Sequence, residues 1–229
     1  MRQRRRLAVI TGAGRGLGKS LVDEFSDAGW AVVALTRAPA TSAERQHVAT
    51  ATHDVRDEPT LELMSVIGNG PIDVLINNAA QGAQHAGLGD IATAGVMNAV
   101  DVNVAGPLRL VQALLPQLLA APDPMIINVT SRLGSVAAQA RGDYSDLSTS
   151  YAYKISKAAQ NMLTISLAQD LAGRVRCLAV HPGKLATGMG QADASKDPGV
   201  AARELRELVD SSDRTSPRFV SLGSADLAW

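Results

Sequence analysis

The chain has 229 residues, of which 46% are hydrophobic and 19% are charged, and its 22 basic and 22 acidic side chains cancel. This length is typical of one α/β domain with a sizeable core, so we expect a single domain over residues 1–229. A net charge of zero argues against nucleic acid or an acidic surface as a partner.

The same composition bears on the compartment and on metal binding. No apolar run approaches the ~20 residues that span a bilayer, and the single Cys177 cannot form an internal disulfide. Four scattered histidines and one cysteine give no metal-ligand spacing. We therefore expect a cytoplasmic protein with no membrane partner and no metal. Residues 1–6 hold four arginines and are expected to form a flexible basic tail.

Short apolar runs alternate with amphipathic segments along the chain, which is typical of strands alternating with helices. Strands are predicted at residues 7–10, 31–35, 72–76, 125–129, 175–180 and 219–222. Helices are predicted at residues 17–28, 61–67, 93–119, 151–171 and 200–209. This alternation predicts an α/β fold with a single Rossmann-type, doubly wound parallel sheet of about seven strands and helices on both faces.

A glycine-rich turn, Thr11-Gly12-Ala13-Gly14-Arg15-Gly16-Leu17-Gly18, joins the first predicted strand to the first helix. Glycines let the backbone approach a pyrophosphate, and the N-terminus of the following helix offers amide donors to it. A glycine turn alone can be purely structural. Its position between two predicted strands favours dinucleotide binding.

Polar residues follow the predicted strands, and ligands of such a sheet bind beyond the carboxyl ends of its strands. These residues should therefore share one rim of the sheet. They are Thr11 to Gly18, Thr36-Arg37, Asp54-Val55, Asn77-Asn78-Ala79-Ala80, Thr130-Ser131 and His181-Pro182-Gly183.

Tyr153 and Lys157 are four residues apart in the predicted helix 151–171 and therefore share a face. A nearby ammonium lowers the pKa of a phenol from about 10 and suits it to acid–base chemistry. The pair alone equally describes a solvated helix surface. Tyr151 and Tyr144 have no lysine four residues later, which leaves Tyr153 as the expected acid and the other two as pocket-lining or surface aromatics.

The glycine turn, Asn77-Asn78-Ala79, Ser131 and the Tyr153–Lys157 pair, in this order, resemble the classical type of the short-chain dehydrogenase/reductase family. The resemblance covers nearly the whole chain. Ser131-Arg132-Leu133-Gly134-Ser135 and His181-Pro182-Gly183 are similar to its carbonyl-reductase-like branch, which includes sniffer and the C-factor proteins. The resemblance implies reversible reduction of a ketone, aldehyde or quinone-like carbonyl, with a hydride from a nicotinamide cofactor.

The resemblance also implies a catalytic tetrad of Asn103, Ser131, Tyr153 and Lys157. Tyr153 would protonate the carbonyl oxygen, and Ser131 would hydrogen-bond the developing oxyanion. Lys157 would lower the tyrosine pKa and hold the nicotinamide ribose. Asn103 would bend the helix 93–119 and hold a water for proton relay, with ordinary helix polarity as the alternative.

NADP(H) is expected in preference to NAD(H). An acidic residue after the second strand would bond a ribose 2′-hydroxyl, whereas this chain has Thr36 and Arg37 there, and Arg15 adds a second cation. The alternative is that both arginines are solvated surface residues, and Asp54 can equally be an ordinary strand-end carboxylate. The implied cofactor contacts are Thr11, Gly12, Gly14, Arg15, Gly16, Leu17, Gly18, Thr36, Arg37, Asp54, Val55, Asn78, Ala79, Ala80, Tyr153, Lys157, Pro182, Gly183 and Thr187.

Two segments depart from the family pattern: Lys184 to Met189 after the Pro-Gly pair, and a polar insert, Gln139 to Ser150, which should border the pocket. Family oligomers pack through the helices that are here 93–119 and 151–171, so a homodimer or homotetramer is expected. A different class of function is an NADP(H)-binding regulatory or signalling protein with little turnover. The intact tetrad argues against this alternative, which stays open.

Overall fold

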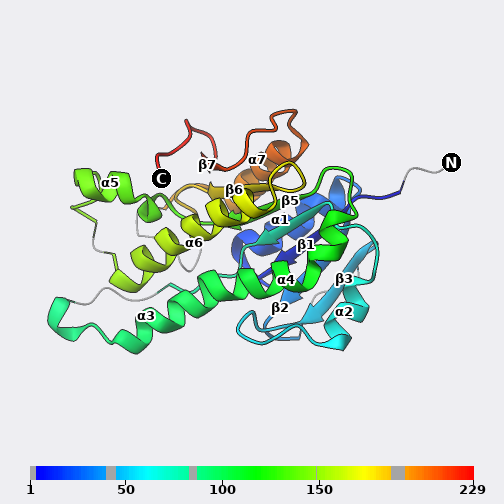
Figure 1. Ribbon diagram of the computed structural model, residues 1–229, viewed down its shortest axis with the longest axis horizontal. Coiled ribbons are helices and arrows are strands. Elements are labelled where there is room, and N and C mark those ends of the chain that lie inside the picture. The colour runs from blue at the N-terminus through cyan, green and yellow to red at the C-terminus, as the bar shows by residue number, and fades with distance from the viewer. Residues whose placement is uncertain (1–3, 40–44, 83–86, 148, 187–193) are drawn as a thin grey trace.

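One parallel sheet of seven strands organises the computed structural model, which describes residues 4–39, 45–82, 87–147, 149–186 and 194–229 (Figure 1). The strand order is β3-β2-β1-β4-β5-β6-β7. This order confirms the predicted doubly wound sheet. The strands are β1 (Leu7–Thr11), β2 (Ala31–Thr36), β3 (Val48–Thr52), β4 (Val74–Asn77), β5 (Met125–Val129), β6 (Arg176–His181) and β7 (Arg218–Ser221).

Seven α-helices connect the strands in the described part of the chain. They are α1 (Gly16–Asp27), α2 (Leu61–Ile67), α3 (Thr93–Val100), α4 (Gly106–Leu119), α5 (Val136–Arg141), α6 (Tyr151–Asp170) and α7 (Pro198–Asp210). Short 3-10 turns lie at Leu88–Asp90 and Arg132–Gly134. None of the described helices is both long and apolar enough to cross a membrane.

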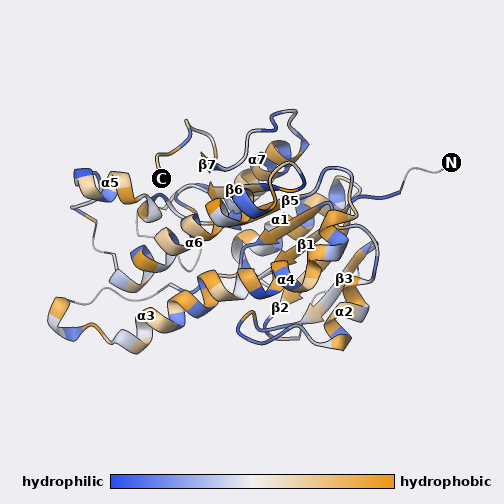
Figure 2. Ribbon diagram, viewed as in Figure 1, coloured by the Kyte–Doolittle hydropathy of each residue, from blue (hydrophilic) through white to orange (hydrophobic). Residues whose placement is uncertain are grey.

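Helices cover both faces of the sheet, because successive side chains of each strand point to opposite faces. Ile10 packs on one face with α1 and α7, where Phe25 and Leu205 are fully buried. Val9 points to the other face, which α2, α4 and α6 cover with residues such as Leu114. In Figure 2 the strands are correspondingly orange between helices that carry blue on their outer sides. The apolar runs of the sequence are thus the middle layer of a three-layer molecule.

Strand β3 lies at one edge of the sheet and was not among the strands predicted by range. Its sequence, Val48 to Thr52, alternates β-branched residues with alanine and stays partly exposed. An edge strand needs no continuous apolar run, because one of its sides faces solvent. The position of Asp54 just beyond a strand is nevertheless as expected.

The predicted continuous helix over residues 93–119 is interrupted. Helices α3 and α4 are joined by a π-helical stretch, Asp101–Ala105, which contains Asn103. Such stretches are rare and usually occur as single turns inside α-helices, frequently at functional sites. The residue after this stretch packs tightly against the end of the β3 segment: a Cβ on Gly106 would lie 2.9 Å from Val55. The bend implied by the family resemblance is therefore a change of helix type.

The described part of the basic N-terminal segment is anchored to the fold. The two Arg4 terminal nitrogens donate to the Asp73 carboxylate at 2.7 and 2.6 Å, and the same carboxylate accepts from the Leu7 backbone nitrogen. The Arg6 guanidinium lies 3.9 Å from the centre of the Trp30 ring. The expectation of a flexible tail therefore does not hold for Arg4 to Arg6.

Candidate active site

The glycine turn closes tightly on itself between β1 and α1. Gly12 has a φ of 64°, and a Cβ there would lie 2.8 Å from the Cα of Ala79. A Cβ on Gly18 would lie only 2.1 Å from the Gly12 carbonyl oxygen. Neither position has room for any side chain. Helix α1 begins at Gly16, within this turn. The first N–H groups of a helix have no partner inside it, so a pyrophosphate could bind them here.

Asn78 and Ala79 hold this turn from the neighbouring strand end. The Thr11 hydroxyl accepts hydrogen bonds from the Asn78 and Ala79 backbone nitrogens at 3.0 and 2.9 Å. The Asn78 side-chain amide donates to the Thr11 carbonyl at 2.9 Å. The end of β1 and the end of β4 are thus fixed to each other, as the rim prediction required, with Ala80 following on the same segment.

Charge at the end of β2 has the sign that suits a phosphate. Thr36 is buried, and its hydroxyl donates to the Ala38 carbonyl at 2.7 Å, so the strand ends without a carboxylate. Arg37 and Arg15 are both exposed beside the turn. Thr36, Arg37 and Arg15 are among the expected cofactor contacts, and their role in cofactor binding stays a prediction. They place two guanidinium groups at the rim and no acidic side chain at the end of β2.

Asp54 is bound by a neighbouring arginine rather than free. Both oxygens of its carboxylate accept from the Arg56 guanidinium, at 3.0 and 2.6 Å. These hydrogen bonds lower the pKa of Asp54 to about 2. Val55, next along, is buried against α4 at Gly106. An adenine amine would therefore share this carboxylate with Arg56.

Ser131 and Tyr153 lie near each other, at the end of β5 and the start of α6. Ser131 is buried just after β5, where its hydroxyl accepts from the Leu133 backbone nitrogen at 3.2 Å. Its hydroxyl lies close enough to Tyr153, which projects from the first turn of α6, to favour the phenolate and lower the pKa of the phenol. That turn is capped by Ser150, whose hydroxyl accepts from the Tyr153 backbone nitrogen at 3.1 Å. A hydroxyl and a phenol therefore converge on one point, as acid catalysis at a carbonyl oxygen requires.

Lys157 lies one helical turn beyond Tyr153 and is only 1% exposed. Its ammonium donates to the Val129 carbonyl and to the Gln160 side-chain oxygen, both at 2.8 Å. The nitrogen is 5.8 Å from the centre of the Tyr153 ring. Burial lowers the pKa of Lys157 to about 7. A cation is thus placed beside the phenol, held by neutral acceptors.

The expected lowering of the Tyr153 pKa by Lys157 is not what this structure shows. Burial raises the pKa of Tyr153, and the nearby Ser131 side chain opposes that rise. The reason is that the Lys157 ammonium is turned toward Val129 and Gln160. The phenol is therefore held in its neutral, proton-donating form at neutral pH.

Asn103 is fully buried. None of the hydrogen bonds of its side chain to described residues goes to Tyr153 or Lys157. It donates to the Gln81 carbonyl at 3.0 Å and to the Ser156 hydroxyl at 2.9 Å, and it accepts from the Gln81 nitrogen at 2.8 Å. The side chain thus joins the π-helical stretch, the segment after β4 and α6. A relay water would have to bond the Asn103 backbone rather than its amide.

The end of β6 closes the rim. Pro182 is buried, and Gly183 has a φ of 96°, with the side chain of Lys196 packed against it. Lys196 is held by an ion pair with Glu204 and a 3.1 Å hydrogen bond to the Leu222 carbonyl. Thr187, the remaining predicted contact, lies outside the described residues.

Two residues that the sequence analysis did not single out support α6 around Lys157. Gln160 is fully buried and accepts from the Lys157 ammonium. Gly134 approaches so closely that a Cβ there would lie 2.7 Å from the Lys157 backbone carbonyl. A glycine three residues after Ser131 is the sequence signal that could have indicated this close approach. Gln160 carries no comparable signal, because a glutamine on a helix is usually solvated.

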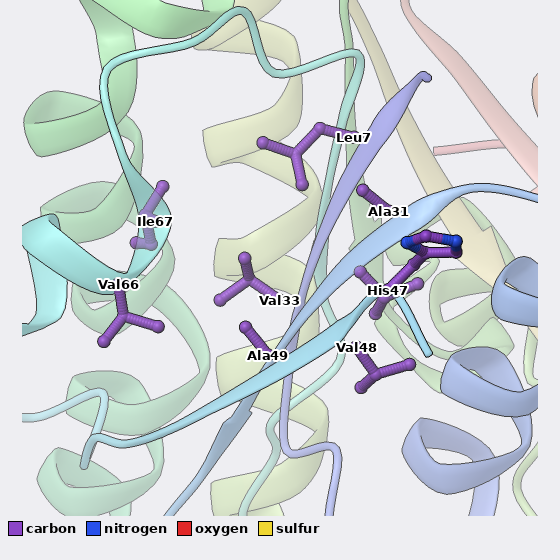
Figure 3. A pocket seen from close by; sticks show the side chains of 9 residues that line it. Leu7, Ala31, Val33, His47, Val48, Ala49, Val66 and Ile67 are labelled. Atoms are coloured by element: carbon purple, nitrogen blue, oxygen red, sulfur yellow. The ribbon is translucent and has the colours of Figure 1, made fainter. Parts of the chain in front are cut away.

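A surface hollow of about 350 Å³ lies well away from these residues (Figure 3). It is formed by the amino-terminal ends of β1, β2 and β3 and by the end of α2, with Leu7, His47 and Val66 on its walls. It contains none of the predicted site residues. Its wall is almost wholly aliphatic, so it lacks the converging polar groups of a catalytic pocket.

Comparison with known proteins identifies the family. A model of the short chain dehydrogenase family matches residues 6–198. The chain belongs to the short-chain dehydrogenase family. This dehydrogenase is 37% identical to C-signal from Myxococcus xanthus over 163 residues, which cover 70% of this chain and 94% of that protein.

Carbonyl reductases are also among the relatives of this short-chain dehydrogenase. Carbonyl reductase (NADPH) 2 from Sus scrofa is 31% identical over 206 residues, covering 87% of this chain and 79% of that protein. The solved structure of carbonyl reductase Sniffer from D. melanogaster has a TM-score of 0.86 and 25% identity, with 99% of this chain and 100% of that chain covered. The resemblance drawn from the motifs is confirmed. A short-chain oxidoreductase of this family takes a nicotinamide nucleotide, which the glycine turn fits.

Proposed function

We propose that the chain is an NADPH-dependent reductase that converts a ketone, aldehyde or quinone-like carbonyl to an alcohol, reversibly. The observation that carries this proposal is the placement of Tyr153 beside two groups: the Ser131 hydroxyl, which lowers the pKa of the phenol, and the buried Lys157 nitrogen, 5.8 Å from the ring centre. Together they form a site that can bind a carbonyl oxygen and protonate it.

In this mechanism the nicotinamide cofactor supplies the hydride when bound. The Ser131 hydroxyl donates to the carbonyl oxygen and stabilises the charge that develops there. Tyr153 donates its phenolic proton to the same oxygen, and its raised pKa keeps it protonated at neutral pH. The phenolate left behind would be costly in a buried site. Lys157, with its nitrogen 5.8 Å from the ring centre, offsets that cost until the proton is restored.

The preference for NADPH over NADH is supported by the charges at the adenosine end. Arg15 and Arg37 are exposed beside the glycine turn, and Thr36 ends β2 without a carboxylate. A 2′-phosphate would be attracted to the two guanidinium groups, whereas a ribose diol would find no acidic partner at β2. Carbonyl reductase (NADPH) 2, a relative, carries this cofactor in its name.

A regulatory role with little turnover is the second candidate, favoured by the 37% identity to C-signal. Such a protein would bind the nucleotide without needing the Ser131–Tyr153 contact. A homodimer or homotetramer is also proposed, through α3, α4 and α6. Exposed apolar side chains on these helices support it: Met97 on α3, and Ile155 and Met162 on α6.

Oxidation of NADPH, followed by absorbance with a panel of carbonyls, tests the proposal. Tyr153→Phe should lose at least about 100-fold in kcat, the usual scale of general-acid catalysis. Tyr151→Phe is the matched control, since Tyr151 is exposed on the same helix turn and should change little. Equal activity of native protein and Tyr153→Phe would contradict the mechanism. NADPH binding without turnover would favour the regulatory role, and NADH binding within about tenfold of NADPH would remove the cofactor preference.

A further inference from the structure

Arg132 is fixed next to the catalytic serine by the packing of the turn that carries it. The 3-10 turn Arg132–Gly134 follows Ser131 directly and rests on α6, because Gly134 touches the backbone of Lys157. The Asn161 side chain also donates to the Gly134 carbonyl at 3.1 Å. Since adjacent Cα atoms are about 3.8 Å apart, the base of the Arg132 side chain cannot leave the vicinity of the Ser131 hydroxyl.

The guanidinium of Arg132 is half-buried and held over an aromatic ring rather than by a carboxylate. Its central carbon lies 5.2 Å from the centre of the Tyr144 ring, which belongs to the polar insert 139–150. Within the described ranges, no acidic side chain forms an ion pair with Arg132. Other partly buried arginines differ, since Arg176 pairs with Asp123 and Arg206 with Glu24. A ring face orients a guanidinium without cancelling its charge.

The charge of Arg132 also acts at the end of the neighbouring strand β6. His181, the last residue of β6, is buried, and its pKa is lowered to about 4, first by burial and then by the charges of Arg132 and Lys196. Lys196 is paired with Glu204. The charge of Arg132 therefore acts at the end of β6, directly before the Pro182–Gly183 turn, and no described side chain forms an ion pair with it.

We propose that Arg132 selects carbonyl substrates that carry a second, anionic oxygen group, of which a carboxylate is the simplest. The proposal rests on the proposed reductase function and specifies its substrate class. The planar guanidinium presents parallel N–H donors that match a carboxylate. Ser131 and Tyr153 hold the carbonyl oxygen, and Arg132, one residue along, holds the anion. Tyr144 keeps the guanidinium from swinging into solvent, which gives the insert a function in substrate choice.

The test compares two aldehydes that differ in charge and by one methyl group, succinate semialdehyde and its methyl ester, with NADPH. The native protein should show at least about a tenfold higher kcat/KM for the acid, as expected for a charge-assisted bidentate contact. Arg132→Met should remove that preference while its kcat/KM for the ester stays within about threefold of native. Arg132→Lys should keep part of the preference. Arg141→Met is the control, because Arg141 is exposed on α5 and paired with Asp143.

A second readout separates this inference from the reductase proposal. Succinate, which cannot be reduced under these conditions, should bind the NADPH-loaded native protein and compete with the aldehyde or raise the melting temperature. Arg132→Met should lose that binding at least tenfold. If neither aldehyde is turned over but succinate still distinguishes the two proteins, the anion site stands and the reductase proposal fails. Equal preference or equal succinate binding in both proteins would overturn the role of Arg132.

Discussion

The buried ammonium of Lys157 makes the stability of the fold depend on pH in a direction opposite to that of an ion-paired lysine. Its pKa is about 7 in the folded chain, against 10.5 for an exposed lysine. Between these values the unfolded chain binds more protons than the folded one. Stability therefore rises as the pH increases through this window, and the full penalty is present below pH 7. Substitution of Lys157 by methionine should remove this dependence.

The size of the effect follows from the shift. Each pKa unit corresponds to about 1.4 kcal/mol, so native stability relative to Lys157→Met should improve by about 3 kcal/mol between pH 6 and pH 9.5. Part of the penalty at any pH is offset by the acceptors Val129 and Gln160, which the variant leaves unpaired. The change with pH, rather than the absolute difference at one pH, is therefore the quantity to measure.

Urea unfolding of the native chain and of Lys157→Met at pH 6, 7.5 and 9.5 measures this quantity directly. Taking the difference between the two proteins at each pH removes groups that titrate in both. Lys154→Met is the matched control, since Lys154 lies on the same helix and is only partly buried. A difference that is the same at all three pH values would refute the burial of a titrating ammonium at this position.

Two further predictions concern the surroundings of Lys157. Gly134→Ala should cost about 1 to 3 kcal/mol, because its Cβ would lie 2.7 Å from the Lys157 backbone, and kcat should fall as Ser131 shifts. Gly70→Ala, where no atom lies within 4 Å of the added Cβ, should be neutral by the same unfolding measurement. Gln160→Leu removes a charge-assisted hydrogen bond worth about 1.5 to 3 kcal/mol, so the pKa of Lys157 should fall by roughly one to two units. The pH window of stability should then begin lower, and an unchanged window would count against the Gln160 contact.

The middle of the sheet was predictable because its strands are buried on both faces and read as continuous apolar runs. Val74 to Ile76 and Met125 to Ile127 are examples, fully or almost fully buried in the structure. Strand β3 was not predicted, because an edge strand of valine, threonine and alanine carries only a weak hydrophobic pattern. The π-helical stretch between α3 and α4 could not be predicted from residue spacing, because a 3.6-residue pattern continues on both sides of it.

The candidate site was predictable where its residues follow strands. The contacts of Thr11 with Asn78 and Ala79 follow from the rule that strand ends share one rim. The orientation of the Lys157 ammonium toward Gln160 could not be predicted. That contact depends on how deeply α6 sits on β5, which tertiary packing decides. The stacking of Arg132 on Tyr144 likewise depends on the path of the insert, and residue spacing carries no information about that path.

The π-helical stretch Asp101–Ala105 sets the rotational phase between α3 and α4. Each residue of an α-helix advances the chain by about 100° around the axis. Removal of one residue from this stretch would therefore rotate every side chain of α3 by that angle relative to α4, and Asn103 would no longer face Ser156 and Gln81. A change of length in the surface loop after α5 would leave the rotational phase between α3 and α4 unchanged. The number of residues between Thr93 and Leu119 therefore determines which side chains of α3 and α4 share a face.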